Sequence, residues 1–231
     1  MPSETTEGRF ESLVTLNRAL LTQHLLRGFA HDLRNQLQVL ALGVTLENAS
    51  SSPLLGERLE HAIHSMANSL DQLARLGRME PDAQQHANLG EVISGVVRLA
   101  ELQRNLPSRR IEVSAGVADT ITVAIPGQIL EQILLNLVAN AKEAPSSDDA
   151  PIAILVERRP PGAVAIAVVD HGSGLPAGAT EWWATERERQ SHGGIGYPVA
   201  VGLVTRYGGT VTEIGGTPHR VVVELATTDQ G

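Results

Sequence analysis

The chain has 231 residues, 42% of them hydrophobic, with no cysteine and a net charge of −8 at neutral pH. This length allows one large core or two small ones, and the scattered Lys and Arg residues exclude a nucleic-acid surface, which needs a basic stripe. The lack of cysteine and of any apolar run near the roughly 18 to 20 residues that span a bilayer excludes disulfides and membrane insertion, and predicts a cytoplasmic protein.

A helical hairpin is predicted at the N-terminus. Helical periodicity runs from Leu13 to Glu47, and a second apolar run covers 55–73 after a polar turn at 48–53. In the first run the apolar residues are spaced alternately by four and three: Leu26, Ala30, Leu33, Leu37, Leu40 and Val44. Each helix of such a hairpin has an apolar stripe, and the two helices alone cannot bury both stripes. We therefore expect a homodimer that closes a four-helix bundle.

A second domain follows the hairpin. We predict a hairpin domain over 1–78, a polar linker over 79–87 and a second domain over 88–231. Asn88 and Glu91 form a candidate capping box for a helix that ends near Leu102. The later elements are strands at 110–115, 120–125, 152–158, 163–170, 209–214 and 220–226, and helices at 127–144 and 197–208. Helices that alternate with largely antiparallel strands predict an α/β sandwich, and the whole chain is of the α+β class.

The first predicted helix carries a polar cluster that packing does not require. His31 lies one position from the apolar stripe, so its ring should reach solvent, while Asp32 is its neighbour and Asn35 lies four residues on, on the same face. A carboxylate can hold the proton of one ring nitrogen and leave the other nitrogen as a nucleophile. An amide one turn away can position a water. The alternative is an ordinary polar histidine on an amphipathic helix.

Three further motifs lie in the second domain. Asn136 and Asn140 share a helical face and offer amide oxygens, which suit Mg²⁺. Asp170 ends a strand and is followed by Gly172 and Gly174, so its carboxylate can accept an amino group from a base. A second glycine-rich loop, with Gly193, Gly194 and Gly196, comes directly before a helix, where bare backbone amides bind phosphate. Each of these motifs alone also fits a solvated pair or an ordinary turn.

The order of these motifs resembles the histidine protein kinases of two-component signalling, over about residues 20–226. "HDLRN" resembles the H box, "NLVANA" the N box, "DHGSG" the G1 box and "GIGY" the G2 box, in the order of that family. The H-box segment "HDLRNQLQVL" and the end of the N-box segment, "NAKEA", are most similar to the branch that contains citrate- and fumarate-sensing kinases and the sporulation phosphotransferase. That branch includes members that no longer bind ATP.

The resemblance implies a role for each matched residue. His31 would be the phosphoacceptor, Asp32 its orienting base, and Asn35 would place water in the reverse, phosphatase direction. Asn136 and Asn140 would bind Mg²⁺ and the nucleotide phosphates, and Asp170 would read the adenine amino group. The glycines would shape the ATP pocket and its lid: Gly172, Gly174, Gly194 and Gly196. The second domain would be the ATP-binding sandwich shared with type II topoisomerases and heat-shock ATPases.

The sequence departs from the family pattern at three places. His192 stands where the family has the first G2 glycine, Tyr197 replaces the usual leucine after the last one, and Glu143 replaces the usual basic residue after the second asparagine. The lid between the glycine loops carries Trp182 and Trp183, which we interpret as packing residues. These departures put contacts of the lid and the phosphates in question.

We therefore expect a soluble, sensorless histidine kinase that phosphorylates His31 from Mg-ATP, passes the phosphoryl group to an aspartate of a response-regulator receiver domain, and also acts as its phosphatase. A separate partner would supply the input signal. The first alternative is a histidine phosphotransfer protein with a degenerate, ATP-free second domain, which a nucleotide-binding measurement distinguishes. The second is a non-enzymatic or serine-directed regulator of the same sandwich fold, such as an anti-sigma factor kinase, whose hairpin would serve only for dimerisation and for which His31 would be dispensable.

Overall fold

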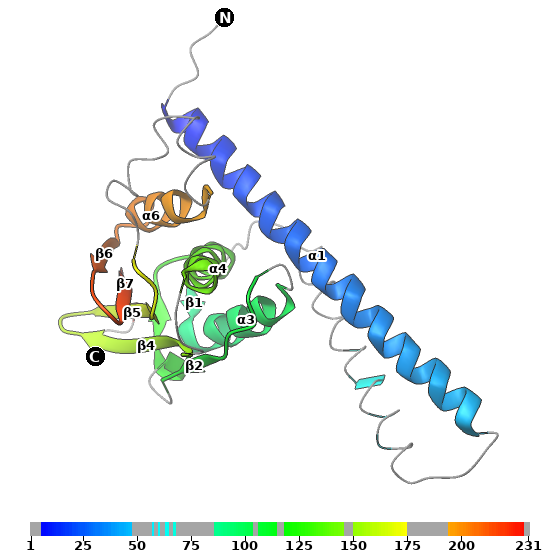
Figure 1. The fold of residues 1–231 in the computed structure, drawn as a ribbon. Coiled ribbons are helices and arrows are strands. Elements are labelled where there is room, and N and C mark those ends of the chain that lie inside the picture. The colour runs from blue at the N-terminus through cyan, green and yellow to red at the C-terminus, as the bar shows by residue number, and fades with distance from the viewer. Residues whose placement is uncertain are drawn as a thin grey trace, which may run out of the picture.

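The computed structural model describes residues 6–47, 57, 60, 63–64, 67, 86–103, 106–114, 118–145, 150–174 and 194–228. Within these residues a long N-terminal helix is followed by an α/β sandwich, as the sequence predicts (Figure 1). The second helix of the predicted hairpin lies largely outside the described residues, where only 57, 60, 63–64 and 67 are assigned and all of them are helical. The predicted linker over 79–87 also lies mostly outside them.

The first helix, α1 (Thr6–Glu47), is longer than predicted, because it begins before Leu13. Glu7 lies in its first turn, where a carboxylate interacts favourably with the helix dipole. The N-terminal half packs against the sandwich, and the other half extends past it (Figure 1). The part of α1 that packs on the sandwich joins its core through five buried side chains: Leu13, Val14, Leu21, Leu25 and Phe29. The start of α1 is therefore an outer layer of the second domain.

Three helices form the inner layer: α3 (Leu89–Leu102), α4 (Gly127–Glu143) and α6 (Gly196–Arg206). The side chain of Asn88 accepts a hydrogen bond of 2.9 Å from the backbone N–H of Glu91, which confirms Asn88 as the N-cap of α3. Helix α4 lies between α3 and α6 and packs on β4 and β5, and four of its apolar side chains are fully buried: Leu130, Ile133, Leu134 and Val138. The helix that carries the two predicted asparagines is thus the centre of the core.

The main sheet has five strands: β2 (Ile111–Val113), β4 (Ile152–Arg159), β5 (Ala163–Asp170), β7 (His219–Ala226) and β6 (Thr210–Ile214), in that spatial order. Among the described strands of this sheet, only β2 and β4 pair in parallel, so the sheet is largely antiparallel, as predicted. The β5–β7 register places His219 directly opposite Asp170. Neighbouring strands therefore bring together two residues that are far apart in the sequence.

A second, two-stranded sheet pairs β1 (Ala87–Asn88) with β3 (Thr122–Val123), and a short 3₁₀ helix at Ala118–Thr120 precedes β3. The sequence predicts a longer strand at 120–125 and places Ala87 in the linker. The difference arises because Ala87 and Val123 are both buried and are partners in the register of this small sheet. Ala87 is thus a part of the sandwich.

Candidate functional site

A small cavity lies between α4, the start of α6 and the ends of β5 and β7. It measures about 30 Å³, and its lining combines polar groups with apolar side chains: Leu137, Asn140, Ala141, Ala144, Val168, Asp170, Gly174, Tyr197, His219 and Val221. Three predicted site residues, Asn140, Asp170 and Gly174, therefore face one cavity. An apolar wall beside a few polar groups is the usual composition of a ligand pocket.

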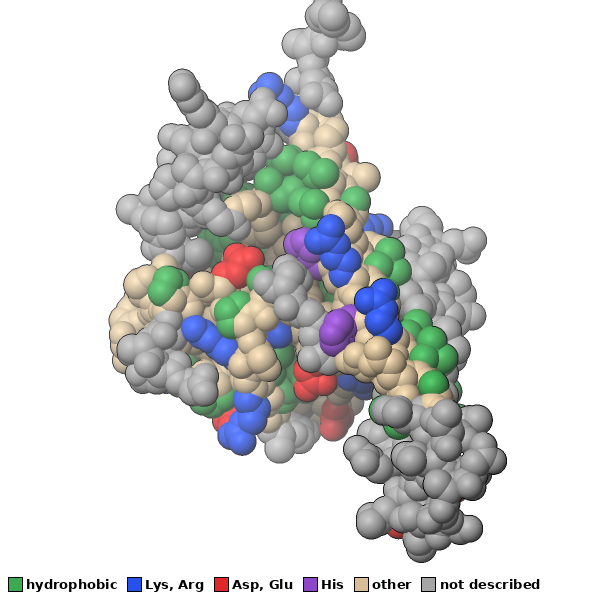
Figure 2. Space-filling model, turned by 45° about the vertical axis from the view of Figure 1, so that its right-hand side comes forward, with side chains coloured by type: hydrophobic (Ala, Val, Ile, Leu, Met, Phe, Trp, Pro, Cys, Tyr) green, Lys and Arg blue, Asp and Glu red, His purple; other side chains and the backbone are tan. Residues whose placement is uncertain are grey.

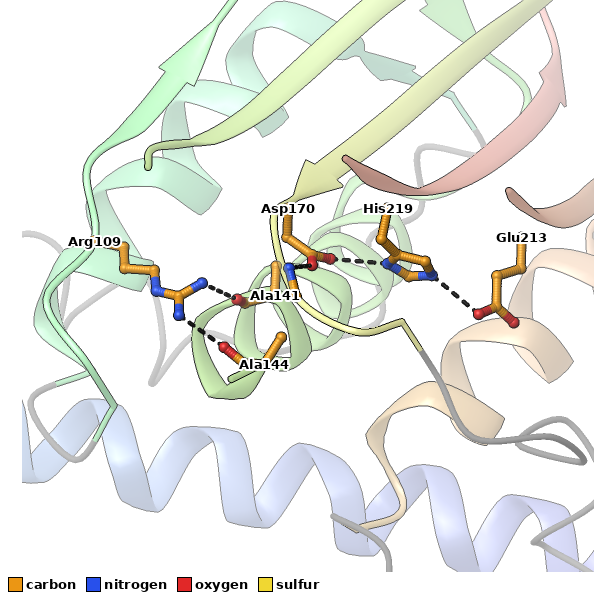
Figure 3. A network of polar contacts seen from close by, with 7 residues as sticks. Arg109, Ala141, Ala144, Asp170, Glu213 and His219 are labelled. Atoms are coloured by element: carbon orange, nitrogen blue, oxygen red, sulfur yellow. Dashed lines mark hydrogen bonds and ion pairs between the residues drawn. The ribbon is translucent and has the colours of Figure 1, made fainter. Parts of the chain in front are cut away.

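Asp170 is held at both of its carboxylate oxygens (Figure 3). Oδ1 accepts a 2.7 Å hydrogen bond from the backbone N–H of Gly172, and Oδ2 lies 3.0 Å from Nδ1 of His219. The other ring nitrogen, Nε2, lies 3.0 Å from Oε1 of Glu213. Asp170 and His219 are both buried, and Glu213 is partly exposed. The result is a chain of three ionisable groups that ends inside the cavity.

Gly172 is required by its surroundings. A Cβ atom at this position would lie 2.5 Å from Cβ of Ala144 and 2.9 Å from Oδ1 of Asp170. Any larger residue would therefore displace the carboxylate or the end of α4. Gly174 lies next to the ring of His219 and has a φ of +80°. Both glycines of the predicted G1 box thus contact the Asp170–His219 pair.

The C-terminal end of α4 is fixed from outside the cavity. Arg109 donates hydrogen bonds of 3.2 and 2.7 Å to the carbonyl oxygens of Ala141 and Ala144 (Figure 3). An arginine here caps the last carbonyls and complements the negative end of the helix dipole. Because both alanines line the cavity, this cap also fixes one of its walls.

The two charged residues after Asn140 do not supply a cation to the cavity. Lys142 is buried, and its Nζ donates a 2.5 Å hydrogen bond to the carbonyl oxygen of Ala100 in α3. Glu143 occupies the position of the usual basic residue, and partial burial raises the pKa of its carboxyl group. Neither side chain is among the residues that line the cavity.

The second glycine-rich loop is described only from Gly194 onward. Gly194 has a φ of +101°, and Gly196 begins α6. Tyr197 is buried in the cavity wall, and burial together with the charge of Glu213 raises the pKa of its hydroxyl to about 12, so the hydroxyl stays protonated. The lid with Trp182, Trp183 and His192 lies outside the described residues.

Asn136 has a different environment from Asn140. It is only 2% exposed, and its Oδ1 accepts a 2.8 Å hydrogen bond from Nδ2 of Asn17 in α1. Its Nδ2 donates to Oδ1 of Asn17 at 2.9 Å and to the carbonyl oxygen of Gln132 at 2.9 Å. Gln132 also donates to Oδ1 of Asn17. The amide of Asn136 is therefore hydrogen-bonded to α1, and Asn136 does not line the cavity.

His31 lies on α1, beyond the part that packs on the sandwich. Its side chain is 55% exposed, with Nδ1 3.5 Å from Oδ1 of Asp32 and 3.2 Å from Nδ2 of Asn35. The predicted cluster is therefore assembled on one helix face, with the ring accessible to solvent. The amide nitrogen of Asn35 can only donate, so it favours an unprotonated Nδ1, whereas the carboxylate of Asp32 favours a protonated one.

Comparison with known proteins agrees with this geometry. Residues 127–228 match the histidine kinase-, DNA gyrase B- and HSP90-like ATPase family. The chain is also 26% identical over 213 residues to the C4-dicarboxylate transport sensor protein DctB of Rhizobium meliloti (strain 1021), covering 87% of this chain and 34% of DctB. Residues 127–228 therefore form a domain of this ATPase family, and the likeness to a sensor histidine kinase extends over most of the chain. The resemblance drawn from the four motifs is thereby confirmed.

The chain spans about a third of the length of DctB. Among solved structures in this histidine kinase family, it is similar to the Acinetobacter baumannii kinase AdeS, with 16% identity, a TM-score of 0.47 and coverage of 89% of this chain and 98% of AdeS. It is also similar to the catalytic domain of the kinase ThkA, with 22% identity, a TM-score of 0.49 and coverage of 61% and 94%. No helix among the described residues combines the length and apolarity of a membrane span.

Five residues of the site were not predicted from the sequence. His219, Glu213, Arg109 and Gln132 belong to no motif, and Asn17 lies before the predicted H box. A signal existed for two of them. His219 alternates with Val221 and Val223 and so falls on the buried face of its strand. Asn17 stands four residues from both Leu13 and Leu21, within an apolar helical stripe.

Proposed function

We propose that the chain is a histidine kinase that transfers the γ-phosphoryl group of ATP to His31 and then to an aspartate of a receiver domain. The observation that carries the proposal is the pairing of two sites in one chain. An exposed histidine is flanked by a carboxylate and an amide, and a sandwich of the ATPase family presents Asp170 and Asn140 in one cavity.

The chemistry at His31 follows from its neighbours. When Nδ1–H donates a hydrogen bond to Asp32, Nε2 carries its lone pair and can attack phosphorus, and Asp32 takes the Nδ1 proton once the N–P bond has formed. The N–P bond forms as the bond from phosphorus to the β–γ bridging oxygen breaks, and ADP leaves. Asp32 stabilises the positive charge that develops on the ring. Rotation of the Asn35 amide away from Nδ1 allows this tautomer.

The cavity fits an adenine nucleotide in its donor set. Asp170 offers a fixed acceptor to an exocyclic amino group, and Leu137, Val168 and Val221 offer apolar contacts to a planar base. Asn140 lines the same cavity and is partly exposed, so its amide oxygen suits a hard cation. Bound Mg²⁺ would neutralise charge on the nucleotide phosphates. The predicted role of Asn136 as a further Mg²⁺ ligand stays a prediction, because its amide must first break its hydrogen bonds to Asn17.

The described arrangement is not the one that transfers phosphate. Asn17, which contacts the predicted phosphate-binding helix, precedes His31 by 14 residues, a separation of roughly 21 Å along a straight α-helix. His31 must therefore meet a nucleotide after the sandwich moves along α1, or meet a sandwich of a second copy. The exposed apolar residues of α1 support a dimer: Leu16, Leu20, Leu26, Leu37 and Val39.

Figure 2 shows this side of the molecule, with hydrophobic side chains along α1 between basic ones. A second copy that packs on this stripe would close the four-helix bundle expected from the heptad-like spacing. The receiver domain, the partner that carries the input signal, the phosphatase role of Asn35 and a cytoplasmic location stay predictions.

The Asp32→Asn variant tests the assigned chemistry. It should lower the rate of His31 labelling from γ-labelled ATP by about 100-fold or more, because an amide cannot take the Nδ1 proton or balance the ring charge. Affinity for a non-hydrolysable ATP analogue should not change, since Asp32 is remote from the cavity. Glu101→Gln, which removes an exposed carboxylate from α3, is the matched control. Wild-type labelling of the Asp32 variant would show that this carboxylate has no part in the transfer.

A further inference from the structure

His219 is a residue that no motif assigns, and it lies at the polar end of the cavity. Both of its ring nitrogens lie 3.0 Å from carboxylate oxygens, Nδ1 from Asp170 and Nε2 from Glu213 (Figure 3). Its side chain is only 3% exposed. The three groups come from β5, β6 and β7, and the register of β5 and β7 sets the Asp170–His219 pair.

This geometry requires a charged imidazole. A carboxylate only accepts hydrogen bonds, so both ring nitrogens must carry a proton to make both contacts. Burial alone lowers the pKa of His219, but the hydrogen bonds to Asp170 and Glu213 and their charges outweigh burial and raise it above its ordinary value of 6.5. The remaining titratable group on the cavity wall is Tyr197, whose hydroxyl stays protonated. His219 is thus a buried cation between two anions.

The contact with His219 fixes the carboxylate of Asp170. Oδ2 lies 3.0 Å from Nδ1 of His219, and Oδ1 accepts a 2.7 Å hydrogen bond from the backbone N–H of Gly172, so the carboxylate is held in one orientation. Without the imidazole, Oδ2 would lose this partner, and the carboxylate would no longer be held in the orientation that receives a ligand amino group. With His219 in place, Oδ1 and Oδ2 each have one lone pair bound within the protein and one left for a donor on the ligand.

We propose that His219 is a positioning residue that makes this cavity selective for a purine with an amino group at C6 over one with a carbonyl oxygen there. The proposal rests on the proposed function in one respect, that the ligand is a purine nucleotide. A carbonyl oxygen that faces an ionised carboxylate loses a hydrogen bond and is repelled. A site built to bind a donor discriminates strongly against a ligand that lacks it.

The test compares two nucleotides on the full chain by titration calorimetry. The probes are the β,γ-imido analogues of ATP and of inosine triphosphate, which differ at C6 of the base. Wild type should bind the adenine analogue at least about tenfold more tightly, as expected for a hydrogen bond to a charged group. The His219→Leu variant should lose most of this preference, mainly by weaker binding of the adenine analogue.

Two further variants complete the experiment. Glu213→Gln removes the outer carboxylate and should reduce the preference in the same direction by a smaller factor, so it decides the matter if the His219 variant does not fold. Arg220→Gln, at the exposed next position of β7, should keep the wild-type ratio. An unchanged ratio in both network variants would overturn the proposal.

Because the analogues carry no transferable phosphoryl group, the result does not depend on whether His31 is phosphorylated. A wild-type chain that binds both analogues equally would overturn the selectivity of His219 and leave the kinase proposal standing. A chain that binds neither analogue would overturn both.

Discussion

Replacing Asp170 with alanine is expected to lower the free energy of unfolding by about 3 to 5 kcal/mol and to remove nucleotide binding. Removal of one partner of a buried ion pair leaves the other as an uncompensated charge, and this accounts for the size of the effect. The partner here is His219, which is as deeply buried as Asp170. The substitution also removes the oxygen that accepts the hydrogen bond from the N–H of Gly172. Urea unfolding at pH 6, where His219 is charged, measures the loss.

A double variant provides the control for this prediction. Asp170→Ala together with His219→Leu should be more stable than the single Asp170 variant, because no buried charge is then left without a partner. Two effects that simply add would show that the two side chains do not interact in the folded protein. A loss below about 1 kcal/mol for Asp170→Ala would contradict the buried pair itself, because surface ion pairs have contributions of that size.

Replacing Gly28 with alanine is expected to release α1 from the sandwich. A Cβ atom at this position would lie 1.8 Å from the carbonyl oxygen of Leu102, at the end of α3, and backbone cannot yield by that amount. The contact lies three residues before His31. Release would break the amide cluster of Asn17, Gln132 and Asn136. Hydrogen exchange should then lose protection at Gln132 and Asn136 side chains and along α1 from Leu13 to Phe29.

The amide cluster favours release because it is incompletely bonded. Oε1 of Gln132 is buried without a hydrogen-bond partner among the described residues, which costs about 1 to 3 kcal/mol. The labelling rate of His31 should therefore rise about tenfold in the Gly28 variant, since the non-transferring arrangement is no longer populated.

Gly95→Ala is the matched control for Gly28→Ala. Gly95 is also within a helix, but its added Cβ would meet nothing closer than 3.6 Å. Both substitutions raise helix propensity by a similar amount, about 1 kcal/mol. Full protection of α1 in the Gly28 variant, equal to that in the Gly95 variant, would show that the N-terminal half of α1 is not held at this contact.

Local patterns in the sequence predicted most of the sandwich. The cap at Asn88, the end of α3 at Leu102 and the strand that ends at Asp170 all follow from side chains near in sequence. The sequence also predicted that Asp32 and Asn35 would surround the ring of His31, because helical spacing fixes that geometry. Periodicity and capping are local, so one sequence is enough to predict them.

Contacts between distant segments could not be predicted in the same way. The pairing of Asp170 with His219 depends on the register of two strands, and that of Asn17 with Asn136 depends on how α1 packs against α4. The packing of α1 also explains why Asn136 and Asn140, equivalent by spacing, differ in environment: one faces α1 and the other faces the cavity. The predicted dimer seam stays a prediction, because a second chain is needed to bury it.

Whether His31 accepts phosphate from ATP can be measured in a single labelling experiment. Purified wild type and the His31→Gln variant are incubated with Mg²⁺ and γ-labelled ATP, and the label on each chain is measured after acid and after base. The label on the wild type should be acid-labile and base-stable, as expected for phosphohistidine, and the variant should carry no label. Equal label on both chains, or label that survives acid, would contradict phosphorylation of His31.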